Sequence, residues 1–113
     1  MKIKLKKVDE HLKEKLKDPY FKELYELEEQ KLSIVKKVID YRIKENITQE
    51  QLADKVGVSQ QHISKIENGN FSSMHTLGKI LLYIGCTVVI KTISLQPRKT
   101  KLIRRRIERL AIA

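Results

Sequence analysis

The chain has 113 residues, of which 24 are Lys or Arg and 14 are Asp or Glu, so its formal net charge is +10. This length allows one domain with one appended element, and it excludes a doubly wound nucleotide-binding enzyme or a barrel. The basic excess points to a polyanionic partner, either nucleic acid or an anionic membrane surface. More than half of the excess lies in residues 96–113, which hold seven basic residues and one acidic residue.

Several classes of protein lack support in the sequence. The single cysteine, Cys86, excludes an internal disulfide, and His11, His62 and His75 have no ligand-like spacing, so we expect no metal and no other cofactor. No apolar run approaches the roughly 20 residues that span a bilayer, and the N-terminus lacks a signal-peptide pattern. We therefore expect a cytoplasmic protein without a membrane partner. Without a glycine-rich phosphate loop or a nucleophile elbow, we do not expect an enzyme.

The first elements along the chain are rich in charge. Lysines alternate with apolar side chains in residues 2–8, which favours a short strand or an extended arm. Residues 9–17 suit a short charged helix. Asp18 and Pro19 are typical of a helix start, and apolar residues then follow a 3.6-residue period to about residue 44, as one long helix or as two.

Residues 18–29 are acidic, with five Asp or Glu against one Lys. One interpretation is an ordinary amphipathic helix that covers its own domain. The other is a docking surface for a basic partner, because aromatic and apolar anchors in acidic surroundings suit such a contact. The two interpretations are compatible, because one helix can cover its own domain and also bind a partner. The anchors of the docking surface would be Tyr20, Phe21, Leu24, Tyr25 and Leu27.

The densest motif is TQEQLADKVGVSQQHISKIENG, residues 48–69. Two short helices joined by a glycine-containing turn are the plan of a helix-turn-helix. Thr48 and Gln51 have capping-box spacing, Ala53 is small where the second helix crosses, and Gly57 suits a left-handed turn. The second helix leaves polar side chains on its outer face, and glutamine and lysine are residues that read base edges. These outer residues are Gln60, Gln61, Ser64 and Lys65.

Because of the residues in this motif, positions 34–84 resemble the five-helix DNA-binding domain of the Cro/CI-type (XRE) repressors. The resemblance implies that Gln60 and Gln61 read bases, with Ser64 and Lys65 beside them. It also implies a partly buried ion pair between Arg42 and Glu67. The alternative is a surface pair that contributes little to stability. The residues expected at the DNA backbone are Gln49, Ser59, His62, Asn68 and Gly69, and for His62 a solvated side chain is an equal alternative.

Residues 87–95, TVVIKTISL, read as a strand where the repressor family has its fifth helix. Together with the preceding segment DPYFKELYELEEQKLSIVKKVID, this is similar to HigA-type antitoxins of type II toxin–antitoxin modules. The resemblance implies a HigB/RelE-like messenger RNA interferase as partner. A homodimer, paired through the strand, would place two recognition helices in successive major grooves of a palindromic operator.

The expected fold class is mostly α: a lambda-repressor-like helix-turn-helix bundle with an N-terminal helical extension and a short C-terminal β-strand. The domains are a toxin-docking extension (1–30), the DNA-binding domain (31–86), a dimerisation strand (87–95) and a basic tail (96–113). The tail is a solvated extension, a phosphate-gripping arm, an amphipathic helix on a neighbour or, least favoured, a membrane-surface helix.

The expected function is a sequence-specific repressor that acts as an antitoxin, represses its own operon and neutralises the toxin. Two alternatives stay open. One is a free-standing phage-type repressor without a toxin partner. The other is a basic adaptor that uses the same domain to bind protein or RNA.

Overall fold

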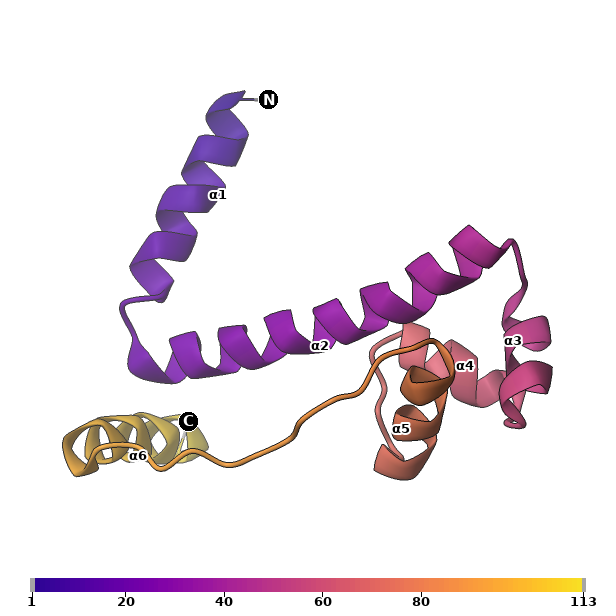
Figure 1. Ribbon diagram of the computed structural model, residues 1–113. Helices are drawn as coiled ribbons and strands as arrows, with labels where there is room; N and C mark the ends of the chain where they lie inside the picture. Colours follow the sequence, from indigo (N-terminus) through magenta and orange to yellow (C-terminus); the bar gives the residue numbers. More distant parts are fainter. Residues whose placement is uncertain (1, 113) are drawn as a thin grey trace. The chain divides into compact units, whose positions relative to one another are not determined.

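The computed structural model describes residues 2–112, and it describes side chains from residue 9 onward. In this part of the chain there are six helices (Figure 1): α1 (Lys2–Lys15), α2 (Pro19–Glu45), α3 (Gln49–Val56), α4 (Gln60–Glu67), α5 (Met74–Tyr83) and α6 (Pro97–Ile112). They divide into two units, one of Met1–Glu28 with Thr92–Ala113 and one of Glu29–Lys91. Among the described residues, none of the helices combines the length and the apolar character that crossing a bilayer requires.

The unit of Glu29–Lys91 contains a hydrophobic core built from the later part of α2 and from α3, α4 and α5. Its side chains are almost completely removed from water, which is the main favourable term in folding. The core holds α3 against α4, the two helices of the predicted motif. Its buried members are Val38, Leu52, Ala53, Val56, Ile63, Ile66, Leu77, Ile80 and Leu81.

Helix α2 is one continuous helix of 27 residues. Val35 and Val38 on this helix are buried, as the 3.6-residue period suggests. The same period also runs through Leu24, Leu27 and Ile43, yet these three side chains are exposed. Periodicity therefore predicted the helix correctly but did not tell which part of its apolar stripe is covered.

Both ends of α3, including the turn that leads to α4, are set by local chemistry. Thr48 and Gln51 form a capping box: the Gln51 N–H donates to Thr48 Oγ1 at 3.0 Å, and the Thr48 N–H donates to Gln51 Oε1 at 2.9 Å. At the other end, Gly57 adopts the left-handed conformation with φ of 82°. The N–H groups of Gly57 and Val58 both donate to the Ala53 carbonyl, at 2.8 and 3.0 Å, so the chain leaves α3 in a fixed direction.

The predicted C-terminal strand is wrong. Residues 87–95 have no regular secondary structure, and residues 2–112 contain no strand (Figure 1). β-Branched side chains suit a pleated, half-buried surface, but a strand also needs a neighbouring strand for its backbone hydrogen bonds. In the described part of the chain no such neighbour exists, and Val89, Ile90 and Ile93 are exposed. The dimerisation role that the sequence suggested for these residues is not tested by a single chain.

The N-terminal strand or arm expected for residues 2–8 is also wrong, because these residues belong to α1. Lysine and leucine are good helix formers, and an isolated strand would leave its backbone groups unpaired. The short helix expected from residue 9 is the second half of the same α1.

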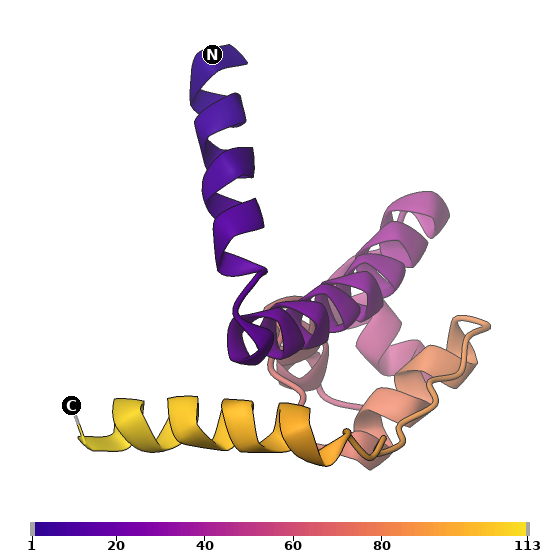
Figure 2. The same cartoon turned by 90° about the vertical axis from the view of Figure 1, so that its left-hand side faces the viewer.

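Ion pairs connect two of the helices in the unit of Met1–Glu28 and Thr92–Ala113. The basic tail is not an irregular extension, because it forms α6, a helix of 16 residues (Figure 2). Two ion pairs join α6 to the start of α2: Lys99 Nζ lies 2.7 Å from Glu23 Oε1, and Arg106 Nε lies 3.2 Å from Asp18 Oδ2. None of the described side chains in this unit is buried.

Candidate nucleic-acid interface

Helix α4 presents a polar face to solvent because its apolar residues anchor the other side. Ile63 and Ile66 are buried in the core, with exposed fractions of 0% and 4%. The three side chains Gln60, Gln61 and Lys65 are exposed on the outer face. Ser64 is half-buried, which leaves less of its hydroxyl available to a ligand than the sequence suggested. The helix is thus held rigidly while its longest polar side chains are accessible.

The start of α4 is capped by Ser59. Its Oγ accepts the His62 N–H at 3.4 Å and also lies 2.9 Å from His62 Nδ1. A capping hydroxyl satisfies one of the free N–H groups at a helix start. Ser59, expected at the DNA backbone, therefore has a structural task as well. The half-buried His62 ring lies against this cap.

Arg42 and Glu67 form a two-pronged ion pair between the last turn of α2 and the end of α4. Arg42 Nε donates to Glu67 Oε2 and Arg42 Nη2 donates to Glu67 Oε1, both at 2.6 Å. The side chains are 19% and 7% exposed. The hydrogen bond to Glu67 raises the pKa of Arg42 above its already high value, against an opposing effect of burial. Paired guanidinium and carboxylate groups of this kind fix orientation as well as adding stability.

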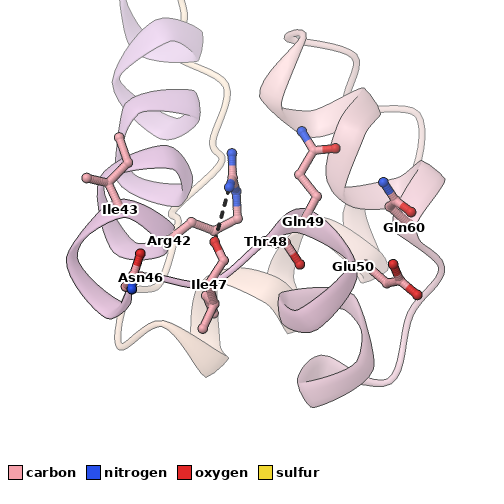
Figure 3. Close-up of a pocket in the computed structure, with 8 residues that line it drawn as sticks. All are labelled: Arg42, Ile43, Asn46, Ile47, Thr48, Gln49, Glu50 and Gln60. Carbon is pink, nitrogen blue, oxygen red and sulfur yellow. Dashed lines mark hydrogen bonds between the residues drawn. The ribbon is translucent and has the colours of Figure 1, made fainter.

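Gln49 joins this pair. Its Nε2 donates to Glu67 Oε1 at 3.3 Å, so the residue expected to contact a phosphate is also tied to the end of α4. Beside it lies an open hollow of about 590 Å³ between the end of α2 and the starts of α3 and α4. Figure 3 shows the side chains of Gln49 and Gln60 beside this hollow, and a hydrogen bond of 3.2 Å from Arg42 Nη1 to the Ile47 carbonyl. The hollow is lined by Arg42, Ile43, Asn46, Ile47, Thr48, Gln49, Glu50 and Gln60.

The turn after α4 contains Asn68 and Gly69. The backbone N–H of Asn68 donates to the carbonyls of Ser64 and Lys65, and that of Gly69 donates to the Ile66 carbonyl at 2.9 Å. These N–H groups are therefore committed to the helix end, and the exposed side-chain amide of Asn68 is the group left for a phosphate. Gly69 has φ of 82°, and a Cβ placed on it would lie 2.8 Å from Lys31 Cε.

The sequence reasoning missed a group of polar residues that gathers where the end of α4 meets the start of α5. A small crevice of about 10 Å³ runs between the end of α4 and the start of α5. Ser73 caps α5 by accepting the Thr76 N–H at 3.2 Å, and the Ser72-Ser73 pair was recognised only as a helix start. The tertiary fold adds hydroxyl and amide groups beside Lys65. The lining residues are His62, Lys65, Ile66, Asn70, Ser72, Ser73 and Thr76.

The residues expected to dock a toxin lie on the first turns of α2, away in sequence from the helix-turn-helix. Phe21 and Tyr25 stack with ring centroids 6.1 Å apart, and Lys15 Nζ lies 5.5 Å from the centre of the Phe21 ring. Leu24 and Leu27 are 45% and 60% exposed, whereas Tyr20 is half-buried. No sequence pattern indicated that the neighbouring acids Asp18 and Glu23 pair with α6 of the same chain.

Comparison with known proteins supports the interpretation of the motif. No curated protein and no solved structure matches the chain. Residues 38–90 match the family described as Helix-turn-helix. The matched segment contains α3, α4 and α5 together with the last turns of α2. Residues 38–90 are thus similar to helix-turn-helix domains of the Cro/CI (XRE) type, a family of DNA-binding domains.

Proposed function

We propose that this protein is a sequence-specific, double-stranded-DNA-binding repressor. The observation that carries the proposal is the outer face of α4, where Gln60, Gln61 and Lys65 are exposed on a helix anchored by Ile63 and Ile66. Glutamine offers a paired donor and acceptor to adenine, and lysine offers a donor to guanine or phosphate. As a homodimer, the protein would place two such helices in successive major grooves of a palindromic operator.

The remaining residues of the proposed interface surround this face. Gln49, Ser59 and Asn68 would approach the DNA backbone, with His62 and Gly69 beside them and Ser64 at the edge of the base-reading row. The ion pair of Arg42 and Glu67 would keep the end of α4 aligned with α2. Because protein groups that are rigid before binding lose less entropy on binding, this pairing would favour a well-defined register on DNA.

A binding assay with the DNA upstream of the gene tests the DNA-binding proposal. Gln60→Ala combined with Gln61→Ala should weaken binding about tenfold or more, since a good paired contact to a base is worth about 1–3 kcal/mol. The matched control is Gln30→Ala with Gln96→Ala, which removes two exposed glutamine side chains elsewhere. If the recognition-helix variant kept both its affinity and its sequence preference, the assignment of α4 would be wrong.

We further propose that the protein is the antitoxin of a HigBA-like module, represses its own operon and neutralises an mRNA-interferase toxin. The support is an apolar and aromatic surface on α2, with Leu24 and Leu27 exposed and the acids Asp18 and Glu23 close by in sequence. A basic, RNA-binding toxin would suit this surface. Since α6 also pairs with these acids, the toxin would have to fit beside α6 or take its place.

Co-expression with the product of the neighbouring gene tests the antitoxin proposal. Leu24→Ala with Leu27→Ala should reduce co-purification of the neighbouring protein and relief of its toxicity, while binding to promoter DNA stays unchanged. The control is Leu32→Ala, an exposed leucine farther along the same helix. If the product of the neighbouring gene formed no complex with the wild-type protein, the antitoxin proposal would be wrong. The protein would then be a repressor without a toxin partner.

A further inference from the structure

Helix α6 has two differently used sides. Lys99 and Arg106 are seven residues apart, which is close to two helical turns, so they lie on the same side of the helix. Both are engaged with the start of α2, through Glu23 at 2.7 Å and Asp18 at 3.2 Å. Ile103, between them in sequence, is half-buried. This side of α6 is therefore committed to contacts within its own unit.

The other basic residues of α6 include a second, free row. Arg98, Lys101, Arg105 and Arg109 follow one another at intervals of three, four and four residues, which aligns them along one side of the helix. All four are exposed, and in the part of the chain that the structure describes none of them forms an ion pair or a side-chain hydrogen bond. Glu108 is the single acid in the helix.

This row has the dimensions of a phosphate-binding surface. Its ends are 11 positions apart, so at 1.5 Å per residue the row extends over about 16 Å. One strand of duplex DNA carries a phosphate about every 3.4 Å of axis, and because the strand winds around that axis, a straight row of this length can meet a few of its phosphates. Three of the four side chains are guanidinium groups, whose fork of donors suits phosphate oxygens.

We infer that the row formed by Arg98, Lys101, Arg105 and Arg109 is a second DNA-contacting surface, which binds the phosphate backbone without regard to sequence. The inference rests on the proposed DNA-binding function and adds an element outside the matched helix-turn-helix domain. It accounts for the placement of charge: residues 48–95 have four basic and three acidic residues, whereas α6 has seven basic residues and one acidic residue. The base-reading domain supplies selectivity, and α6 supplies affinity that depends on salt.

The structure favours DNA over a membrane surface for this helix. A helix that lies on a membrane buries a wide apolar face in lipid. In α6 the apolar side chains Leu102, Ile107 and Leu110 are 46–49% exposed, so about half of their surface is already covered, and Ile112 at the end of the helix is the one large apolar side chain with most of its surface open, at 88%. The free row of cations, in contrast, is exposed along its whole length. The row stands on a helix that is formed from its first turn, where the Thr100 N–H donates to the Gln96 carbonyl at 3.0 Å.

The test measures binding of the full chain to a duplex of scrambled sequence and to the promoter duplex over a series of salt concentrations. The row variant carries Arg98→Gln, Lys101→Gln, Arg105→Gln and Arg109→Gln. Its affinity for scrambled DNA should fall. The slope of log K against log salt should flatten by about 0.9 for each phosphate that is no longer neutralised, to a total of about 3–4. The ratio of promoter to scrambled affinity should not fall.

A control variant changes the net charge equally at exposed lysines outside α6, through Lys13→Gln, Lys22→Gln, Lys36→Gln and Lys37→Gln. It should flatten the slope far less than the row variant. A charge-keeping variant with Arg98→Lys, Arg105→Lys and Arg109→Lys should retain most of the wild-type slope. Circular dichroism checks that each variant keeps its helix content, and glutamine is chosen because it is a good helix former.

Three outcomes would overturn the inference. The first is a slope of log K against log salt that is the same in the row variant as in the wild-type protein. The second is an equal flattening of this slope in the row and control variants, which would show that only the net charge matters. The third comes from a parallel measurement with vesicles of phosphatidylserine and phosphatidylcholine: the wild-type protein binds them, and the row variant loses this binding while its binding to DNA is intact. In all three, promoter selectivity that depends on Gln60 and Gln61 would leave the proposed repressor function standing. A wild-type protein that binds neither duplex at low salt would overturn both proposals.

Discussion

The two units of this chain are stabilised in different ways. In the unit of Glu29–Lys91, side chains such as Leu52, Ile63 and Ile80 are completely buried, and the polar pair of Arg42 and Glu67 is largely shielded from water. In the unit of Met1–Glu28 and Thr92–Ala113, none of the described side chains is buried, and partly exposed ion pairs join α6 to the start of α2. The difference teaches that the proposed base-reading helix belongs to the unit with the buried core, whereas the charge-rich helices occupy the unit with the weaker contacts.

The largest expected effect comes from the core. Leu52→Ala should lower the free energy of unfolding by about 2–5 kcal/mol, because it removes a fully buried side chain and leaves a cavity. Urea denaturation followed by circular dichroism measures the change. The same substitution at the exposed Leu27 should stay within about 0.5 kcal/mol. Similar losses at both sites would contradict the proposed difference between the units.

The shielded ion pair should come next. The Glu67 side chain is only 7% exposed, and Arg42→Met would remove its charged partner. This change should lower the free energy of unfolding by about 1.5–3 kcal/mol. The double variant Arg42→Met with Glu67→Gln should recover part of that loss, because the unpaired charge is gone. A double variant whose loss equals the sum of the two single losses would show that the pair is not coupled.

A smaller effect is expected at the turn of the helix-turn-helix. Gly57→Ala should destabilise the protein by about 1–2 kcal/mol, since a side chain at φ of 82° is strained. Gly78→Ala, inside α5 with open space around the added Cβ, should instead stabilise it by about 0.4–1 kcal/mol. Thermal or urea denaturation compares the two variants. Equal effects of the same sign would rule out backbone conformation as the cause.

The smallest effect is expected in the unit with the exposed pairs. Lys99→Ala removes the contact with Glu23 and should cost about 0.2–1 kcal/mol, a loss that shrinks at high salt. Hydrogen exchange of the α6 amides reports the change locally. Lys101→Ala, at an exposed lysine with no ion pair among the described residues, is the control and should leave exchange nearly unchanged. A loss as large as that at Leu52 would indicate hidden packing in this unit.

Most of the candidate DNA interface could be predicted from the sequence because its signals are local. The capping box of Thr48 and Gln51 and the glycine at position 57 are set by neighbours within a few residues, and the structure has both. The polar row of α4 follows from helical period once Ile63 and Ile66 are assigned to the core. The roles of these residues on DNA stay predictions until the binding experiments are made.

The errors occurred where a partner element decides the outcome. The β-branched run at 87–95 has the composition of a strand, but in the described part of the chain no other strand pairs with it. The alternation in residues 2–8 likewise gave way to α1, whose backbone hydrogen bonds are all local. The apolar period of α2 could not show that Leu24 and Leu27 stay exposed, because coverage depends on which helices pack nearby.

The sequence by itself determined the helix-turn-helix, its caps and three of the four residues expected on the outer face of α4, all but the half-buried Ser64, because 3.6-residue periodicity and turn chemistry act over short distances. Only the tertiary structure decided how distant charges are paired. It added a Gln49 hydrogen bond to the Arg42–Glu67 pair that the family resemblance implied, and it engaged Lys99 and Arg106 with α2 while leaving the row of Arg98, Lys101, Arg105 and Arg109 exposed. The physical reason is that composition counts charges, whereas each charge acts through the groups that lie within a few ångströms of it.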